Sequence, residues 1–253
     1  MSEMINLNDY SIVLLSAGVG QRLGPLGGKK PKCLLKINNQ TLIELLINNL
    51  KKRNAKKISI IVGYKSQMLI NFLKKIKKIK INFIKIRGYK KNGHSYSWFL
   101  YKNYWLKEKK PMILFHTDIH FDPIFLDNIL ISKKSDIIGV KCKEYHTLKK
   151  RRYFVEVNNK NKIKKINSID KINRPQQEVI GINKFSAKTT KNIFDFMGKF
   201  FNKNNKFLQW ETLIDHYIRK TNDSIFILKK QNYSHVNINT IDDYYKAKIL
   251  KFN

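Results

Sequence analysis

The chain has 253 residues, with 51 Lys and Arg against 18 Asp and Glu, so its formal net charge is +33 at pH 7. A hydrophobic content of 42% is enough to build a core and excludes an intrinsically disordered chain. No stretch reaches the roughly 20 apolar residues that span a bilayer, and residues 1–10 do not resemble a secretion signal. Two cysteines, Cys33 and Cys142, are too few for a disulfide framework or a zinc site of their own. We therefore expect a soluble, cytoplasmic protein in a reducing compartment.

A charge this positive is typical of nucleic-acid-binding proteins, because lysines and arginines that neutralise phosphates release counterions. Here the basic residues are spread over almost every segment, accompany an excess of Asn and Ile, and come with no nucleic-acid-binding motif. Lys, Asn and Ile have codons rich in A and T, so compositional drift explains the charge, and we expect no specific nucleic-acid partner. A preference for anionic substrates or for an anionic membrane surface stays open. Residues 65–80, where apolar residues recur at helical spacing beside lysines, fit either a membrane-surface helix or a helix with its apolar stripe in the core.

The first 140 residues alternate short apolar runs with helical patterns. We predict strands at residues 11–16, 58–62, 81–87, 111–116 and 136–141. We predict helices at residues 41–53, which Thr41 and Glu44 begin as a capping box, and at residues 65–78, 94–107 and 123–131. Strands that alternate with helices need crossover connections, so the sequence predicts an α/β fold with a doubly wound, mostly parallel, Rossmann-like sheet.

The second half of the chain changes character. Residues 151–157 and 162–168 form a predicted polar hairpin, followed by a strand at 179–185, helices at 187–201 and 210–220, a strand at 224–229 and a last helix from Ile241. There is no Pro- or Ser-rich linker and no internal repeat. We therefore expect one domain over residues 1–253, with a core at about 1–140, a smaller inserted, substrate-facing β lobe at about 141–235 and a closing helix at about 236–253.

The most informative segment covers residues 14–36 and reads LLSAGVGQRLGPLGGKKPKCLLK. In a doubly wound sheet the ligand lies beyond the carboxyl ends of the strands, so a glycine-rich loop after the first strand is expected to hold an anion. Gly18 and Gly20 allow backbone N–H groups to approach a phosphate. A dinucleotide fingerprint fails by one position, because Leu23 stands where its third glycine belongs. A P-loop fails because Gly24 and Gly28 enclose three residues instead of four.

Four cations, Arg22, Lys29, Lys30 and Lys32, lie within eleven residues of this loop. Cations this close repel one another unless a polyanion is present, and a triphosphate is the obvious candidate. A merely solvated basic loop would not explain why Pro31 fixes the chain immediately before Lys32.

The pattern Ala17-Gly18-x-Gly20-x-Arg22-Leu23, followed by Pro31-Lys32, resembles the signature of the nucleotidyltransferases, or pyrophosphorylases, which join a nucleoside triphosphate to a phosphorylated small molecule. The resemblance implies a GT-A-like fold in which the glycine loop and the arginine hold the triphosphate, and the lysine stabilises charge during transfer. The catalytic residues that it implies are Lys32 and Arg22. The nucleotide-binding residues that it implies are Ser16, Ala17, Gly18, Gly20, Gln21, Arg22, Gly63, Asn92 and Ser95.

The resemblance also implies Mg²⁺ as cofactor, held by an aspartate just past the strand at residues 111–116 and by a second residue near the C-terminus. Asp118 and Asn237 are the expected metal ligands, although Thr117 replaces a glycine that the family usually has, and Asn237 stands where many members have Asp. Magnesium suits this role because it accepts one or two protein oxygens and keeps substrate oxygens. A rival interpretation is a transition-metal site at His116, Asp118 and His120, which alternate along the chain.

Residues 92–98 (NGHSYSW) resemble a segment of the phosphocholine and phosphonate cytidylyltransferases, and so do residues 178–182 and 209–211. This likeness implies five acceptor contacts: Tyr96, Trp98, Glu178, Trp210 and Glu211. Carboxylates and aromatic rings suit an ammonium group. The two tryptophans fit equally well as core residues, and Glu211 fits as a charge at a helix start.

The expected activity is a Mg²⁺-dependent transfer of CMP from CTP to a phosphocholine-, phosphonate- or phospho-amino-acid-like acceptor, with release of pyrophosphate. Because the acceptor oxygen is already ionised, no general base is needed. One alternative is a sugar-1-phosphate nucleotidyltransferase. Another is a non-catalytic anion- or RNA-binding protein on the same scaffold. A dimer is compatible with the sequence, which does not set the oligomeric state.

Overall fold

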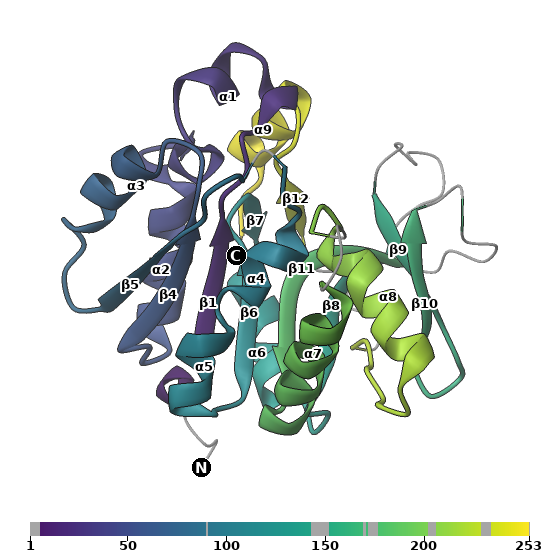
Figure 1. Cartoon of the computed structure of the whole chain (residues 1–253). Helices are drawn as coiled ribbons and strands as arrows, with labels where there is room; N and C mark the ends of the chain where they lie inside the picture. Colours follow the sequence, from purple (N-terminus) through teal and green to yellow (C-terminus); the bar gives the residue numbers. More distant parts are fainter. Residues whose placement is uncertain are drawn as a thin grey trace.

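The structure is a computed structural model that describes residues 6–89, 91–142, 152–168, 171, 177–201, 206–228 and 234–252. Its centre is an eight-stranded sheet in the order β10-β9-β11-β6-β1-β4-β5, with β8 also paired to β11 (Figure 1). The strands of this sheet are β1 (Ser11–Ser16), β4 (Lys57–Val62), β5 (Lys80–Lys85), β6 (Met112–His116), β8 (Ile137–Cys142), β9 (Tyr153–Val157), β10 (Ile163–Ser168) and β11 (Gln177–Phe185).

The sheet has a parallel half and an antiparallel half. Strands β5, β4, β1 and β6 run parallel, whereas β11 is antiparallel to β6, β8 and β9. The predicted α/β fold with a central parallel sheet is confirmed. The predicted hairpin of β9 and β10 is also present, and it extends the central sheet through β11 instead of forming a separate one.

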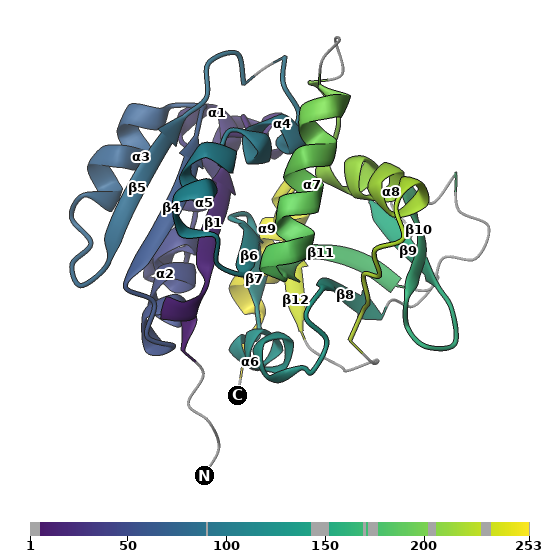
Figure 2. The same cartoon turned by 60° about the horizontal axis from the view of Figure 1, so that its bottom comes forward.

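Helices cover both faces of the sheet, because alternate side chains of a buried strand point to opposite faces. Val13 of β1 packs with one helix layer, and Leu14 packs with the other. One layer holds α2 (Leu42–Lys52), α3 (Ser66–Leu73) and α6 (Pro123–Ile131). The other holds α4 (His94–Phe99), α5 (Lys102–Glu108), α7 (Ala187–Phe200) and α8 (Trp210–Lys220), which Figure 2 shows together on one side of the sheet. Among the residues described, no helix combines the length and the apolar character needed to cross a membrane.

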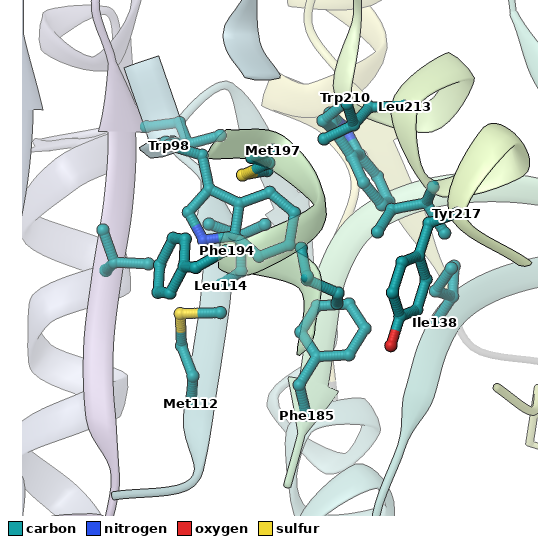
Figure 3. Close-up of a cluster of buried hydrophobic side chains, with 14 of the residues drawn as sticks. Trp98, Met112, Leu114, Ile138, Phe185, Phe194, Met197, Trp210, Leu213 and Tyr217 are labelled. Atoms are coloured by element: carbon teal, nitrogen blue, oxygen red, sulfur yellow. The ribbon is translucent and has the colours of Figure 1, made fainter. Parts of the chain in front are cut away.

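The larger part of the core lies between the sheet and the second helix layer (Figure 3). The Trp98 ring is stacked on Phe185, with 5.7 Å between ring centroids, and meets the Phe194 ring edge-on. Trp210 and Tyr217 of α8 are fully buried in the same cluster. Burial of large aromatic side chains therefore fixes α7 and α8 against the antiparallel half of the sheet.

Three predicted elements need correction. The helix expected at 94–107 is two helices, because the backbone N–H of Tyr101 bonds to the Trp98 carbonyl in a tighter turn that interrupts the α-helical ladder. The strand expected at 224–229 makes only isolated bridges at Phe226, and residue 229 lies outside the described part of the chain. The hairpin strand expected from residue 151, which is also outside the described part, begins at Tyr153.

Other local predictions hold. Thr41 and Glu44 form the predicted capping box of α2. Helix α3 is shorter than the predicted 65–78, and it buries Leu69, Ile70 and Leu73, so its apolar stripe belongs to the core. A short helix in the glycine-rich segment, α1 (Pro25–Lys29), was not expected from the sequence.

The segment before the C-terminus returns to the carboxyl ends of β1 and β6. Strand β12 (His235–Asn237) pairs antiparallel with β7 (Ile119–Phe121), and α9 (Ile241–Ile249) follows. A hairpin of two short strands, β2 (Lys36–Ile37) and β3 (Gln40–Thr41), precedes α2. In Figure 1, α1 and α9 lie together above β1, so residues from both ends of the chain meet at this edge of the sheet.

We expect Phe194→Ala to lower the free energy of unfolding by about 3–5 kcal/mol, because it removes a fully buried ring from the aromatic cluster. Urea denaturation followed by circular dichroism measures the change. The control is Ile131→Ala on α6, whose side chain is 64% exposed and whose loss should change stability by no more than about 0.5 kcal/mol. Equal effects of the two substitutions would contradict the assignment of this cluster as the main core.

Candidate active site

Two glycines allow the loop after β1 to pack closely against its neighbours. Gly20 has a φ of +72°, and a Cβ at this position would lie 2.7 Å from Lys32 Cγ. A Cβ on Gly27 would collide with the carbonyl oxygen of Gly20. The loop can therefore close against the Lys32 side chain only because both positions lack a side chain.

Lys32 begins a one-turn 3₁₀ helix (Lys32–Leu34), in which Cys33 and Leu34 are buried and anchor the turn in the core. The Lys32 ammonium donates hydrogen bonds to Asp118 Oδ2 at 2.7 Å and to Asn239 Oδ1 at 2.9 Å. Only 16% of the Lys32 side chain and 23% of the Asp118 side chain are accessible. The pair is thus a largely buried, charge-assisted contact at the carboxyl end of β6.

Asn239 is the site residue that the sequence analysis missed. Its Oδ1 accepts a second hydrogen bond, from Arg22 Nη2 at 2.9 Å. Thr240 begins α9 as a capping box with Asp243, and the Asp243 carboxylate also accepts from the backbone N–H of Asn239. The sequence feature that could have identified Asn239 is its position: it is the second asparagine of the Asn237-Ile238-Asn239 run and directly precedes Thr240, the N-cap of α9.

The ladder of β7 and β12 brings Asp118 beside Asn237. Asn237 pairs with Ile119, and the backbone N–H of Ile238 donates to the Asp118 carbonyl at 2.8 Å. Asn237 Oδ1 is buried, and no described residue supplies it with a hydrogen-bond partner. The two residues expected as metal ligands therefore meet, although they are distant in the sequence.

The Lys32 ammonium keeps the Asp118 carboxylate ionised. Burial alone would raise the pKa of Asp118, but the charge of the Lys32 ammonium and its hydrogen bond act against burial and hold this pKa at about 2. Burial raises the pKa of the neighbouring Cys33 thiol to about 12, so the thiol stays protonated at neutral pH. Of Asp118 and Cys33, only Asp118 is therefore ionised at neutral pH.

A cavity of about 810 Å³ opens above these groups. It is lined by nine residues that the sequence analysis selected, namely Gly18, Gly20, Gln21, Arg22, Lys32, Asp118, Glu178, Glu211 and Asn237. Asn239 and Arg152 line it too. Residues from the glycine loop, β6, β11, α8 and the C-terminal segment thus share one cavity.

Five of the expected nucleotide-binding residues lie around the cavity without lining it. Ser16 Oγ is 3.1 Å from Cys33 Sγ, and Ala17 is buried. A Cβ on Gly63 would lie 2.9 Å from the Ala17 carbonyl oxygen, so this glycine allows close packing under the loop. Asn92 and Ser95 donate to the backbone carbonyls of Arg87 and Leu208. In the structure these five residues support the loop and the start of α4.

Three of the expected acceptor contacts also lie outside the cavity lining. Trp98 and Trp210 have no accessible surface and belong to the core of Figure 3. The Tyr96 ring packs edge-on against Phe201, 5.6 Å between centroids. The structure therefore favours the core interpretation of the two tryptophans.

The two expected glutamates line the cavity but differ in their partners. Glu178 forms an ion pair with Arg152 at 2.6 Å, and Arg152 also lies 3.5 Å from Asp243. Glu211 Oε2 is closed off from solvent. Burial, with a smaller contribution from the negative charge of Asp118, raises the pKa of Glu211 to about 8, against the opposing effects of its own backbone N–H and of the Trp210 side chain.

The rival transition-metal site does not form. The His116 ring faces His94, 5.2 Å between centroids, whereas the His120 ring packs on Phe252. Within the described ranges, no three His, Cys, Asp or Glu side chains are placed to hold a metal ion together. Burial, with the nearby His94, lowers the pKa of His116 to about 3, so this imidazole is neutral at physiological pH.

The chain shares its sequence pattern and its fold with known proteins. The model of a family described as nucleotidyl transferase matches residues 11–247. A CTP:phosphoglutamine cytidylyltransferase of Campylobacter jejuni is 28% identical over 200 residues, which cover 73% of this chain and 76% of the relative. A choline-phosphate cytidylyltransferase of Streptococcus pneumoniae is 25% identical over 243 residues, which cover 94% of this chain and 97% of the relative. The structure of an inositol-1-phosphate CTP transferase from T. maritima superposes with a TM-score of 0.77 at 18% identity, over 94% of this chain and 95% of that chain, which shows the shared fold.

The buried Glu211 carboxyl predicts a pH effect on stability. Because its pKa is higher in the folded chain than in the unfolded one, the folded chain binds more protons between about pH 4.5 and pH 8, and stability falls as pH rises through this range. We expect the Glu211→Gln variant to gain stability relative to the wild type at pH 8 compared with pH 5, as measured by urea denaturation at both values. An identical pH dependence of the two proteins would contradict the raised pKa.

Proposed function

The chain belongs to the nucleotidyl transferase family, and from this premise we propose that it is a cytidylyltransferase, which transfers CMP from CTP to a phosphorylated small molecule and releases pyrophosphate. Two relatives that match most of the chain are cytidylyltransferases by name, which supports CTP as the nucleotide. The observation that carries the proposal is the contact of the Lys32 ammonium with Asp118 and Asn239 beside the glycine loop.

The glycine loop, Arg22 and Lys32 are the proposed triphosphate site. The loop offers backbone N–H groups at the carboxyl end of β1, and two cations line the same cavity. An oxygen of the acceptor phosphate attacks the α-phosphorus of CTP, the bond from this phosphorus to the bridging oxygen breaks, and pyrophosphate leaves with that oxygen. The attacking oxygen is already ionised, so the work of the chain is to position the two substrates and to stabilise the developing negative charge through Lys32 and Arg22.

Mg²⁺ is the proposed cofactor, because members of this family typically use a divalent metal. The groups that would hold it are the Asp118 carboxylate and the amide oxygens of Asn237 and Asn239. They fit the ion, since magnesium prefers oxygen ligands and the buried Asn237 Oδ1 lacks a hydrogen-bond partner among the described residues. When bound, the ion would neutralise charge on the phosphates.

The acceptor is proposed to bind at the other end of the cavity, against Glu178 on β11 and Glu211 on α8. The substrates that the relatives' names give, phosphoglutamine and choline phosphate, support an acceptor of the phosphorylated amine, phosphonate or amino acid class. In this arrangement residues 1–140 form the nucleotide half, residues 141–235 face the acceptor, and residues 236–253 close the site. We place the reaction in the cytoplasm, where CTP is available.

Pyrophosphate release tests the proposal. The full chain is assayed with each of the four nucleoside triphosphates, with and without Mg²⁺, and with phosphocholine, phosphoethanolamine, aminoethylphosphonate or hexose 1-phosphates. The proposal expects turnover that needs CTP, Mg²⁺ and an amine-bearing or amino-acid-like acceptor. Turnover only with hexose 1-phosphates identifies a sugar-1-phosphate enzyme instead, and no turnover with any pair rejects catalysis on this scaffold.

We expect Lys32→Ala to lower kcat by at least about a hundredfold, because the variant loses the ammonium that stabilises charge during transfer. Steady-state rates of pyrophosphate release measure the loss. Lys191→Ala is the matched control, since Lys191 is a surface lysine on α7 paired with Asp195. A rate within about twofold of the wild type for Lys32→Ala would remove Lys32 from the catalytic machinery.

A further inference from the structure

One arginine connects the β9–β10 hairpin with the C-terminal segment. Arg152 directly precedes β9 and lines the cavity. Its Nη1 donates to Glu178 Oε1 on β11 at 2.6 Å, and its Nη2 lies 3.5 Å from Asp243 Oδ1 on α9. Only 3% of the Glu178 side chain and 5% of the Asp243 side chain are accessible. The planar guanidinium thus bridges two buried carboxylates through different nitrogens, which suits its forked geometry.

The second oxygen of Asp243 holds the backbone before α9. Asp243 Oδ2 accepts hydrogen bonds from the N–H groups of Asn239 at 3.1 Å and of Thr240 at 3.0 Å. The Thr240 hydroxyl in turn accepts from the Asp243 N–H, and α9 begins there. A buried carboxylate that loses its cation is strongly destabilising. Arg152 therefore stabilises the group on which the conformation of residues 239–243 depends.

Asn239 connects this backbone to the candidate active site. Its Oδ1 accepts hydrogen bonds from Lys32 Nζ and from Arg22 Nη2, each at 2.9 Å. Because the asparagine side chain is short, these distances hold only while the Asn239 backbone keeps its position. Arg152 makes no bond to Asn239 within the described chain, so its effect on this side chain passes through Asp243.

On these grounds we propose that Arg152 is a positioning residue, which ties the β9–β10 hairpin and β11 to the cap of α9 and thereby holds Asn239 against Lys32. This inference rests on the proposed function, since it assigns Asn239 to the site of CTP and Mg²⁺. The two ion pairs of Arg152 then do more than stabilise the fold, because they keep an amide oxygen of the cation site in place.

Hydrogen exchange of single amides, measured by NMR on the full chain, tests the inference. In Arg152→Gln we expect the N–H groups of Asn239 and Thr240 to exchange at least about fivefold faster than in the wild type, because Asp243 no longer holds them in place. The amides of β1, which lie in the centre of the sheet, report global stability and should keep their wild-type rates.

Arg219→Gln is the matched control. Arg219 also pairs with a buried carboxylate, that of Asp215, but it lies on α8 and is not among the residues that line the cavity. Its loss should leave the exchange of Asn239 and Thr240 at wild-type rates. Unchanged exchange of these two amides in Arg152→Gln, or an acceleration that is equal in β1, would overturn the inference.

A second variant provides the same test if Arg152→Gln does not fold. In Arg152→Gln/Glu178→Gln, a neutral amide also replaces the buried Glu178 carboxylate, so no charge on β11 is left without its cation. The contact with Asp243 is still lost. The same acceleration at Asn239 and Thr240 is therefore expected, and wild-type rates at these amides would again overturn the inference.

Calorimetry connects the exchange rates with function and separates the two proposals. Mg²⁺ should tighten CTP binding by at least about tenfold in the wild type and in Arg219→Gln, but by less than about threefold in Arg152→Gln. A gain in Arg152→Gln within about twofold of the wild-type gain would overturn the inference. If the wild type binds no CTP, the proposed function fails, and the exchange rates decide the inference alone.

Discussion

The site depends on one buried contact, in which the ammonium of Lys32 is shared by oxygens of Asp118 and Asn239. Three segments that are distant in the sequence supply these groups: the turn after the glycine loop, the end of β6 and the cap of α9. Without the lysine, a buried carboxylate would lose the charge that compensates its burial. The close approach of Gly20 to Lys32 and the capping box of α9 hold this contact in place. The same oxygens and the same cation are those that a metal-bound triphosphate would engage in the proposed reaction.

The sequence predicts the parts of the site that local pattern and sheet topology determine. Lys32 and Asp118 could be found because each lies just past the carboxyl end of a buried strand, where parallel strands place their ligands together. Asn239 could not be found this way. Its role depends on the long-range pairing of β12 with β7 and on the position of a helix cap, and the neighbouring Asn237 has the same side-chain chemistry. The tryptophans were ambiguous for a related reason: the apolar pattern of α4 and α8 does not distinguish a ring that faces a cavity from one that faces the core.

The cavity is polar at both ends, and this polarity is independent of the large net charge of the chain. Lysines are scattered over the surface, but within the cavity two cations lie opposite two glutamates, and Arg152 is neutralised by its carboxylate neighbours. A small phosphorylated molecule with its phosphate toward Arg22 and Lys32 matches this distribution.

We propose that Asp118 and Asn239 act together as a cation-binding unit that couples a metal ion to the nucleotide. Calorimetric titration of CTP into the full chain, with and without Mg²⁺, tests this role when the wild type is compared with Asp118→Asn and Asn239→Ala. We expect Mg²⁺ to tighten CTP binding by at least about tenfold in the wild type and this gain to be lost in both variants. An undiminished Mg²⁺ effect in either variant, or CTP binding in the wild type that Mg²⁺ does not change, would contradict it.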